Sequence, residues 1–463
     1  MTNMKIRRIT AALAALCCVG AFAQTEGGIS EEMLKEIRKS YQNTAADKAV
    51  RNALNTTSIS VLAENAANQA MIDTHFSDRV KTKGITNQKQ SGRCWLFTGL
   101  NVLRAKAISE HDMGEFQFSQ SYCFFYDQLE KSNLFLQAII DTRKLPVDDR
   151  KVDWLLSNPL SDGGTFTGVS NLVSKYGVVP AEVMPESFIA NNTSAFCAQL
   201  KTILRQDALK LRECKSAKKA QEMKLGMLGE IYRLLCLAYG EPPVEFEWSF
   251  YDASGNFVSR KSYTPQSFYQ EFVGLDLNHN YVMLMNDPCR EYYKTYEIEY
   301  DRHLYDGDNW LYLNLPLDRI KEIAIAGIKG GDAMYFSCDV GKFLHRKKGT
   351  LDLANYDYES LLGVNFTMDK KQRITTHASG SSHAMTLIAV DLQDGKPTKW
   401  MVENSWGRES GYQGCLIMTD EWFDEYMFRL VAERRYIPED LLPYLDQKPV
   451  QLPAWDPMFL PEE

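Results

Sequence analysis

The sequence predicts an α+β protein of two or three lobes, with helices mainly before residue 240 and strands mainly after it. At about 150 residues per domain, a length of 463 residues is too great for one ordinary compact domain. Before residue 240, apolar residues recur every three or four positions, as on one face of a helix. After it, short aromatic and β-branched runs alternate with Asn, Asp and Gly, as in strands joined by turns.

Residues 1–23 have the three parts of a secretory signal peptide. Basic residues precede an apolar run at 9–22, and a small-x-small sequence ends it. The run is too short to remain as a bilayer span. We therefore expect cleavage after Ala23 and an exported mature protein, periplasmic or secreted, with no membrane anchor. Cys17 and Cys18 leave a lipoprotein as the alternative, although the residues before them fit a lipid-attachment site poorly.

The composition is that of a soluble globular protein. Hydrophobic residues make up 44% of the chain and charged residues 24%, and the net charge is −8 with a pI near 5.6. This acidic balance gives no reason to expect nucleic acid as a partner. Eight of the ten cysteines lie beyond the signal peptide, with neither a C-x-x-C pair nor a zinc-type spacing among them. We expect most of them to be buried thiols.

Helices are predicted along the first half of the mature chain. Their expected starts are Ser30, which can serve as an N-cap, Cys94, Ser119 and Val169. Gly177 provides a stop for the helix that includes Val169. A segment rich in lysine and arginine, from about 194 to 239, predicts one long helix that Gly240 ends.

The second half of the chain predicts mainly strands. Strand-like runs occupy 282–285, 310–315, 333–340, 385–390 and 400–404. Between the second and third of these runs, residues 317–328 have the spacing of a helix.

Cys94 is the first candidate for chemistry. The apolar spacing that follows it makes it the first residue of a buried helix, and Gly92 just upstream permits a tight turn. At that position the unpaired backbone N–H groups and the helix dipole favour a thiolate. Gln88, six positions earlier (94 − 88), can direct an amide to the same place and hold an oxyanion. The alternative is a small buried hydrophobic side chain, the usual role of a free cysteine.

A thiolate nucleophile needs a base, and His383 has the most suitable context of the seven histidines. It directly precedes the strand-like run 385–390, which predicts an imidazole at the exposed start of a rigid strand. Asn404, 21 positions later (404 − 383), ends the next predicted strand. If the two strands pair, Asn404 returns beside His383 and fixes which imidazole nitrogen faces the thiol, while Trp406 shields that hydrogen bond from water.

A further candidate is the loop at residues 161–164. Its adjacent glycines, Gly163 and Gly164, let the backbone of a ligand approach closely. The alternative is a plain turn.

Together these motifs resemble the papain-like cysteine peptidases, most closely the branch of bleomycin hydrolase and bacterial aminopeptidase C. The matching sequences are Gln88, Ser-Gly-Arg-Cys94-Trp, His383-Ala-Met and Glu-Asn404-Ser-Trp406-Gly. The similarity extends from about Ile29 to Met458. His383 follows Cys94 by 289 positions (383 − 94), against about 130–150 in papain-type enzymes. The surplus agrees with the inserted domains of this branch.

The resemblance implies a two-lobed papain-like catalytic fold with inserted helical and mixed α/β segments. The expected parts are a signal peptide at 1–23, a helical lobe with the nucleophile at 24–195, an inserted region at 196–330, a β lobe with His and Asn at 331–440, and a C-terminal arm at 441–463 that enters the active-site cleft.

It also implies a role for each candidate residue. Cys94 is the nucleophile, His383 the general base and then acid, and Asn404 the orienting residue. Gln88 and the Cys94 backbone N–H form the oxyanion hole. No metal or cofactor is required. The expected substrate-binding residues are Gly163, Gly164, Trp406 and Glu463.

The expected activity is release of single N-terminal residues from peptide substrates. In this branch the carboxylate of the C-terminal arm meets the substrate's α-ammonium group and blocks longer peptides. The ending Glu462-Glu463 departs from the usual small or basic residues, and the signal peptide departs from the cytosolic location of well-known relatives. The branch also implies a homohexamer. The alternatives are an endopeptidase or general amide hydrolase and, from another class, a non-catalytic scaffold that binds peptides.

Overall fold

The computed structural model describes residues 27–69 and 73–458, and the chain divides into two compact units, Met1–Ala63 and Glu64–Glu463. The signal peptide expected at residues 1–23 lies outside the described residues. In the first unit the structure describes α1 (Glu31–Ser40), α2 (Ala45–Leu54) and α3 (Ile59–Leu62). The predicted N-cap is confirmed, because the Ser30 Oγ accepts a hydrogen bond of 3.0 Å from the Met33 N–H.

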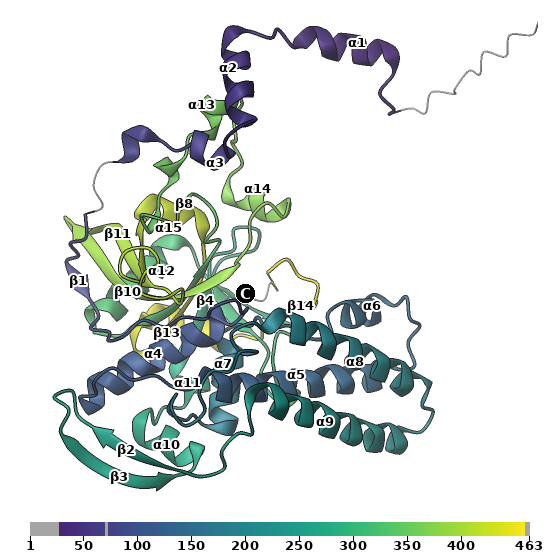
Figure 1. Ribbon diagram of the computed structural model, residues 1–463, viewed down its shortest axis with the longest axis vertical. Coiled ribbons are helices and arrows are strands. Elements are labelled where there is room, and N and C mark those ends of the chain that lie inside the picture. Colours follow the sequence, from purple (N-terminus) through teal and green to yellow (C-terminus); the bar gives the residue numbers. More distant parts are fainter. Residues whose placement is uncertain (1–26, 70–72, 459–463) are drawn as a thin grey trace, which may run out of the picture. The chain divides into compact units, whose positions relative to one another are not determined.

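The second unit combines a group of helices with a large sheet (Figure 1). Its longer helices are α4 (Cys94–His111), α5 (Gln120–Thr142), α6 (Arg150–Ser157), α7 (Phe166–Tyr176), α8 (Thr193–Glu213), α9 (Ala217–Tyr239), α10 (Pro265–Phe272) and α12 (Leu317–Lys329). Shorter ones are α11 (Leu277–Asn280), α13 (Tyr358–Leu362), α14 (Lys370–Thr375), α15 (Asp420–Tyr426) and α16 (Leu442–Leu445). The predicted helices at Cys94, Ser119, Val169 and 317–328 are confirmed.

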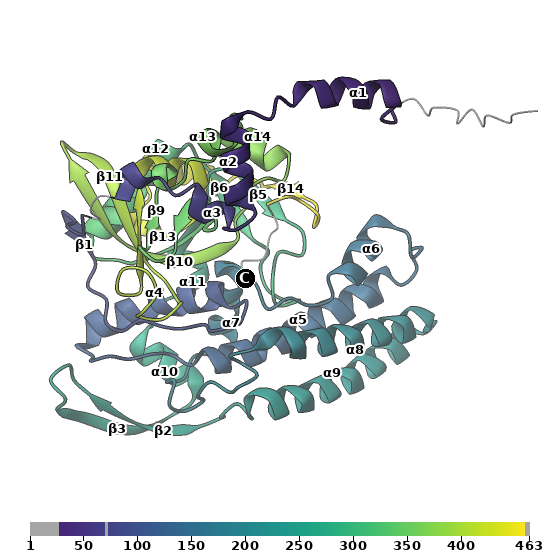
Figure 2. The ribbon, with the colours of Figure 1, turned by 45° about the horizontal axis from the view of Figure 1, so that its top comes forward.

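The segment predicted as one long helix forms two. α8 ends at Glu213 and α9 begins at Ala217, and both pack against α5 (Figure 2). The break occurs because Cys214 is extended and the Ser216 side chain accepts from the Lys219 N–H, which caps a new helix. On both helices the apolar residues at helical spacing are buried: Leu200, Leu204 and Leu211 on α8, and Met227, Ile231 and Leu235 on α9.

Gly177 ends α7 as predicted. Its φ is +73°, in the left-handed region, and a β-carbon there would lie 2.3 Å from the Pro265 carbonyl oxygen. Both the backbone conformation and the close approach therefore require glycine.

Among the described residues, twelve strands form one mixed sheet, in the order β14-β5-β6-β4-β13-β7-β10-β11-β12-β9-β8, with β1 paired to β10. Their bounds are β1 (Asp78–Arg79), β4 (Tyr281–Met285), β5 (Lys294–Ile298), β6 (Leu311–Asn314), β7 (Met334–Cys338), β8 (Leu344–His345), β9 (Thr350–Leu351), β10 (His383–Gln393), β11 (Lys396–Glu403), β12 (Cys415–Thr419), β13 (Met427–Glu433) and β14 (Val450–Leu452). A separate hairpin consists of β2 (Phe246–Tyr251) and β3 (Phe257–Tyr263).

The centre of the sheet positions the predicted site. β10 lies between β7 and β11, and its residues from His383 to Asp391 are all buried, which explains the nearly continuous apolar run. β4, β5 and β6 come from the region expected to be inserted, yet they belong to this same sheet. The region 196–330 therefore supplies part of the sheet in addition to separate helices. Local patterns could not show this, because strand neighbours are set by long-range pairing.

Within residues 27–69 and 73–458, none of the helices combines the length and the hydrophobicity that crossing a bilayer requires.

Candidate active site

Cys94 is the first residue of α4, as predicted, and it is fully buried. Its Sγ accepts a hydrogen bond of 3.5 Å from the backbone N–H of Ala384. Ala384 is the residue after His383 in β10, so this contact joins the start of the helix to the start of the strand. The position places the sulfur at the positive end of the helix dipole, where a thiolate is favoured.

His383 and Asn404 meet as the strand pairing predicted. The His383 Nε2 lies 2.9 Å from the Asn404 Oδ1, and the Ser405 backbone N–H donates to the same oxygen at 2.8 Å. A backbone N–H can only donate, so the atom it meets must be the oxygen of the amide. His383 therefore donates through Nε2–H, and in the neutral imidazole Nδ1 is the basic nitrogen.

The prediction that His383 lies at an exposed strand end is wrong. Its exposed fraction is 2%, because Asn404 covers one side and the Trp406 ring lies 4.9 Å away, centroid to centroid. The indole therefore covers the imidazole and limits access of water to the His383–Asn404 hydrogen bond. Arg346 in turn lies over the Trp406 ring at 5.0 Å.

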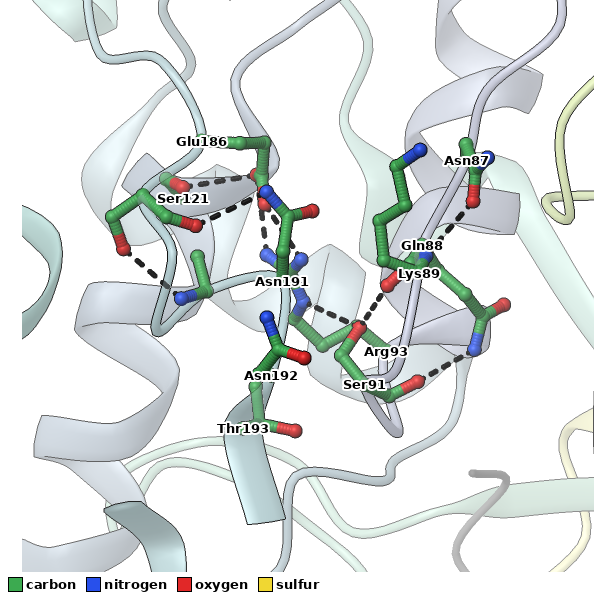
Figure 3. A network of polar contacts seen from close by, with 12 residues as sticks. Asn87, Gln88, Lys89, Ser91, Arg93, Ser121, Glu186, Asn191, Asn192 and Thr193 are labelled. Carbon is green, nitrogen blue, oxygen red and sulfur yellow. Dashed lines mark hydrogen bonds and ion pairs between the residues drawn. The ribbon is translucent and has the colours of Figure 1, made fainter. Parts of the chain in front are cut away.

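Gln88 is held by groups from both sides of the site. Its Nε2 donates to the Ser91 carbonyl at 2.7 Å (Figure 3). Its Oε1 accepts from the Ser405 Oγ at 2.6 Å. The Gln88 backbone N–H also donates to the Ser405 carbonyl at 2.8 Å. These contacts fix the orientation of the amide, so that its N–H₂ end points toward Ser91, three residues before Cys94.

Gly92 is needed for a different reason from the one predicted. Its φ is outside the left-handed region, so a tight turn does not explain it. A β-carbon there would lie 2.8 Å from an Asp162 carboxylate oxygen, and the Gly92 N–H donates to Asp162 Oδ2 at 2.9 Å. Gly92 therefore lets the loop before Cys94 approach the loop that carries Gly163 and Gly164.

Arg93, the residue before the nucleophile, links the same loop to Glu186. It is fully buried and pairs with Glu186 through Nη2 and Oε2 at 2.6 Å, and its Nε donates to the Ser91 Oγ at 3.0 Å (Figure 3). Ser121 on α5 donates to the same carboxylate. In the sequence, Arg93 stands out only as part of the motif Ser-Gly-Arg-Cys94-Trp, and a basic residue before an apolar helix is the one signal of this role.

The expected substrate-binding residues fall into three groups. Gly163 and Gly164 are buried in their loop and border a cavity of about 240 Å³. Trp406 is partly exposed beside His383. Glu463 lies outside the described residues, so its position relative to the site stays a prediction.

Other buried cysteines differ from Cys94 in their surroundings. Burial raises the pKa of the Cys123, Cys197 and Cys415 thiols to about 12. These three remain protonated and unreactive near neutral pH. Across the described part of the chain, the His, Cys, Asp and Glu side chains form no group of three or more that is able to hold a metal ion.

A buried ion pair supports the residue next to Asn404. Arg104, on α4, contacts Glu403 with an Nη2–Oε1 distance of 2.5 Å, and the two side chains are 2% and 1% exposed. Burial raises the pKa of the Glu403 carboxyl, and Arg104 opposes that rise. The pair links the nucleophile's helix to the end of β11, where Asn404 begins the next loop.

Arg104→Met should destabilise the protein, because it leaves the Glu403 carboxylate buried without its partner. We expect the free energy of unfolding, measured with urea, to fall by about 3–5 kcal/mol. Glu403→Gln in the same chain should restore part of the loss by removing the charge. As a control, Arg260→Met breaks a pair whose side chains are 65% and 64% exposed and should leave the unfolding midpoint unchanged. Equal losses in the single and double variants would contradict the role of the buried charge.

Comparison with known proteins agrees with this geometry. The Peptidase C1-like family matches residues 28–459. Aminopeptidase C of Lactobacillus delbrueckii subsp. lactis is 37% identical over 93% of this chain and 98% of its own length, and human bleomycin hydrolase is 43% identical over 81% and 86%. The crystal structure of PepW from Lactobacillus rhamnosis superimposes with a TM-score of 0.90 at 36% identity, covering 94% of this chain and 99% of that one. The chain therefore belongs to the Peptidase C1-like family.

Proposed function

We propose that this protein is a cysteine aminopeptidase that removes N-terminal residues from peptides through a thioester intermediate. The single observation that carries the proposal is the shared Asn404 oxygen, which fixes the His383 tautomer beside the buried Cys94. The similarity to aminopeptidase C over nearly the whole chain supports the same reaction. A binding scaffold has no need of this arrangement.

The proposed reaction uses the chain's own side chains. The Nδ1 of His383 takes the proton of the Cys94 thiol, and the resulting thiolate attacks the carbonyl carbon of the N-terminal residue. The developing oxyanion is held by the Gln88 amide and the Cys94 backbone N–H. When the C–N bond breaks, His383 gives its proton to the leaving amine. Water then attacks the thioester, His383 takes its proton, and Cys94 is released as thiolate. Asn404 holds the imidazole in place throughout.

The restriction to N-termini is proposed to come from the C-terminal arm. Described contacts fix this arm as far as Met458: Arg429 donates to the Met458 carbonyl at 2.7 Å, and Arg290 pairs with Asp456. In the sheet, Arg429 on β13 pairs with Ser337 on β7, and Ser337 pairs with Ala384 on β10. Two strand spacings, about 10 Å, therefore separate the backbone of Arg429 from that of Ala384, the residue after His383.

Five residues extend at most about 17 Å. We propose that the segment 459–463 brings the Glu463 carboxylate to the substrate's α-ammonium group. We also propose, from the resemblance alone, a homohexamer, and from the sequence of residues 1–23 an exported protein.

Cys94→Ala should abolish turnover of aminoacyl-4-nitroanilides, because it removes the nucleophile. Labelling by a thiol-directed epoxide, followed by intact mass, should disappear in the same variant. Cys197→Ala is the matched control, since its thiol is buried and protonated, and it should keep both properties. Activity that survives Cys94→Ala would refute the mechanism.

Gln88→Ala should lower kcat by about 10²–10³, the usual effect of losing one oxyanion donor. Alkylation of Cys94 by iodoacetamide forms no oxyanion, so its rate should change little. Comparison of the two rates separates loss of the oxyanion donor from loss of the nucleophile. A parallel fall in both rates would show that Gln88 acts by supporting the loop.

Removal of residues 459–463 tests the proposed arm. The full-length protein should release single N-terminal residues and leave N-acetylated peptides intact, and the shortened protein should cleave N-acetylated peptides internally. Product analysis by mass spectrometry distinguishes these patterns. If the full-length protein cuts N-acetylated peptides, the endopeptidase or amide hydrolase alternative is correct; if deletion leaves the products unchanged, the arm does not set the restriction.

A further inference from the structure

A buried charged cluster lies behind the Gly163–Gly164 loop, formed by side chains of α5 and of the segment between β5 and β6. Asp127 and Lys131 are one turn apart on α5, with an Oδ2–Nζ distance of 2.9 Å and side-chain exposures of 0% and 10%. His303, from the segment between β5 and β6, lies 2.5 Å from the Asp127 Oδ1 through its Nδ1. Ionic groups this deeply buried are costly unless they are paired and hydrogen-bonded.

All three N–H bonds of the Lys131 ammonium group are accounted for. Besides Asp127, it donates to the Ser161 carbonyl at 2.9 Å and to the Gly163 carbonyl at 2.7 Å. The peptide bond between Gly163 and Gly164 is trans. Its carbonyl and N–H therefore point in opposite directions, so the contact with Lys131 directs the Gly164 N–H away from the cluster.

His303 fills the space that side chains at the neighbouring glycines would occupy. A β-carbon on Gly164 would lie 2.3 Å from the His303 Cε1, and one on Gly168 would lie 2.2 Å away. The His303 ring also packs edge-to-face on Trp95, the residue after the nucleophile, at 4.6 Å. Burial and the nearby Lys131 lower the pKa of His303, so the ring is neutral and donates from Nδ1 to Asp127.

The charge state of the cluster follows from these contacts. Burial alone would raise the pKa of the Asp127 carboxyl, but Lys131 and His303 outweigh it and hold that pKa below its usual value. Asp127 is thus an anion balanced by the Lys131 cation, with a neutral histidine between the carboxylate and the loop.

We propose that Lys131, held by Asp127 and packed beside His303, is a positioning residue that fixes the Gly163–Gly164 peptide for contact with the substrate backbone. This inference rests on the substrate-binding role proposed for those two glycines. Lys131 acts on the substrate through the peptide group and takes no part in the bond-breaking steps.

The nucleophile has other anchors in which Lys131 makes no hydrogen bond, although its Nζ lies 5.3 Å from the centroid of the Trp95 ring. The Asp162 carboxylate accepts from the Gly92 N–H at 2.9 Å and from the Thr193 hydroxyl, and the Trp95 indole N–H donates to the Asp162 carbonyl at 2.9 Å. Loss of the Lys131 ammonium group should therefore disturb the Gly163–Gly164 peptide more than the loop before Cys94.

The test is the double variant Lys131→Met/Asp127→Asn in the full-length protein. Removing both charges avoids an unpaired buried carboxylate, and the amide oxygen that replaces the carboxylate still accepts from His303. We expect kcat/KM for an aminoacyl-4-nitroanilide to fall about tenfold or more, the effect of a lost hydrogen bond. The rate of Cys94 alkylation by iodoacetamide, which has no peptide backbone to position, should change less than about twofold, because the anchors of the nucleophile stay in place.

Lys224→Met is the matched control, because Lys224 also donates to side chains of α5, Asn133 and Gln137. It should leave both rates unchanged. Equal falls of kcat/KM and alkylation in the double variant would overturn the inference, as would an unchanged kcat/KM. Asp127→Asn alone keeps the Lys131 ammonium group and should lower kcat/KM by less than the double variant does. It replaces the double variant in the test if that variant does not fold. Failure of the proposed function would differ, since the wild-type protein would not turn over the substrate.

Discussion

The site depends on the pairing of two loops, residues 86–88 before the nucleophile and residues 405–407 after Asn404. The Gln88 N–H donates to the Ser405 carbonyl at 2.8 Å, and the Gly407 N–H donates to the Thr86 carbonyl at 3.0 Å. The Ser405 hydroxyl adds a bond to the Gln88 side chain. Because one loop leads into α4 and the other follows β11, this pairing sets where the thiol, the imidazole and the oxyanion donor lie relative to one another.

Buried charges surround this pairing, and each has a partner. Arg93 pairs with Glu186, Arg104 with Glu403 and Lys131 with Asp127. Such pairs add little net stability, because desolvation offsets their attraction. Here each one joins two elements that are distant in sequence or holds a loop against a helix, so its effect is to fix their geometry. A cysteine peptidase benefits from this rigidity, since catalysis requires its groups to be in place before the substrate arrives.

The sequence predicted what depends on local spacing. It placed Cys94 at the first position of a helix, Gly177 at a helix end, and Asn404 beside His383 through pairing of successive strands. It predicted that Trp406 shields the His383–Asn404 hydrogen bond, but not that His383 itself is buried, because the path of the surrounding loops is set by distant contacts. Nor did it predict the helix break at Ser216, since the sequence alone does not distinguish a serine that caps a helix from a serine within a polar helix.

The buried charges were missed for the same reason. Asp127 and Lys131 are one helical turn apart, a spacing typical of a solvent-exposed pair. Only the tertiary structure shows that the loop at Ser161–Gly164 and His303 cover them. Gly92 was identified only as a turn residue. Its close approach to Asp162 was missed, because the carboxylate that occupies its side-chain space lies 70 positions away in the sequence.

The most direct test of the account is to trap the covalent intermediate. The protein is mixed with an N-terminally free aminoacyl ester, quenched in acid within milliseconds, digested, and analysed by mass spectrometry. The account predicts that the peptide containing Cys94 gains the mass of one aminoacyl group, bound as a thioester that hydroxylamine removes, and that an N-acetylated ester gives no adduct. An adduct on another residue, or equal labelling by the N-acetylated ester, would contradict it.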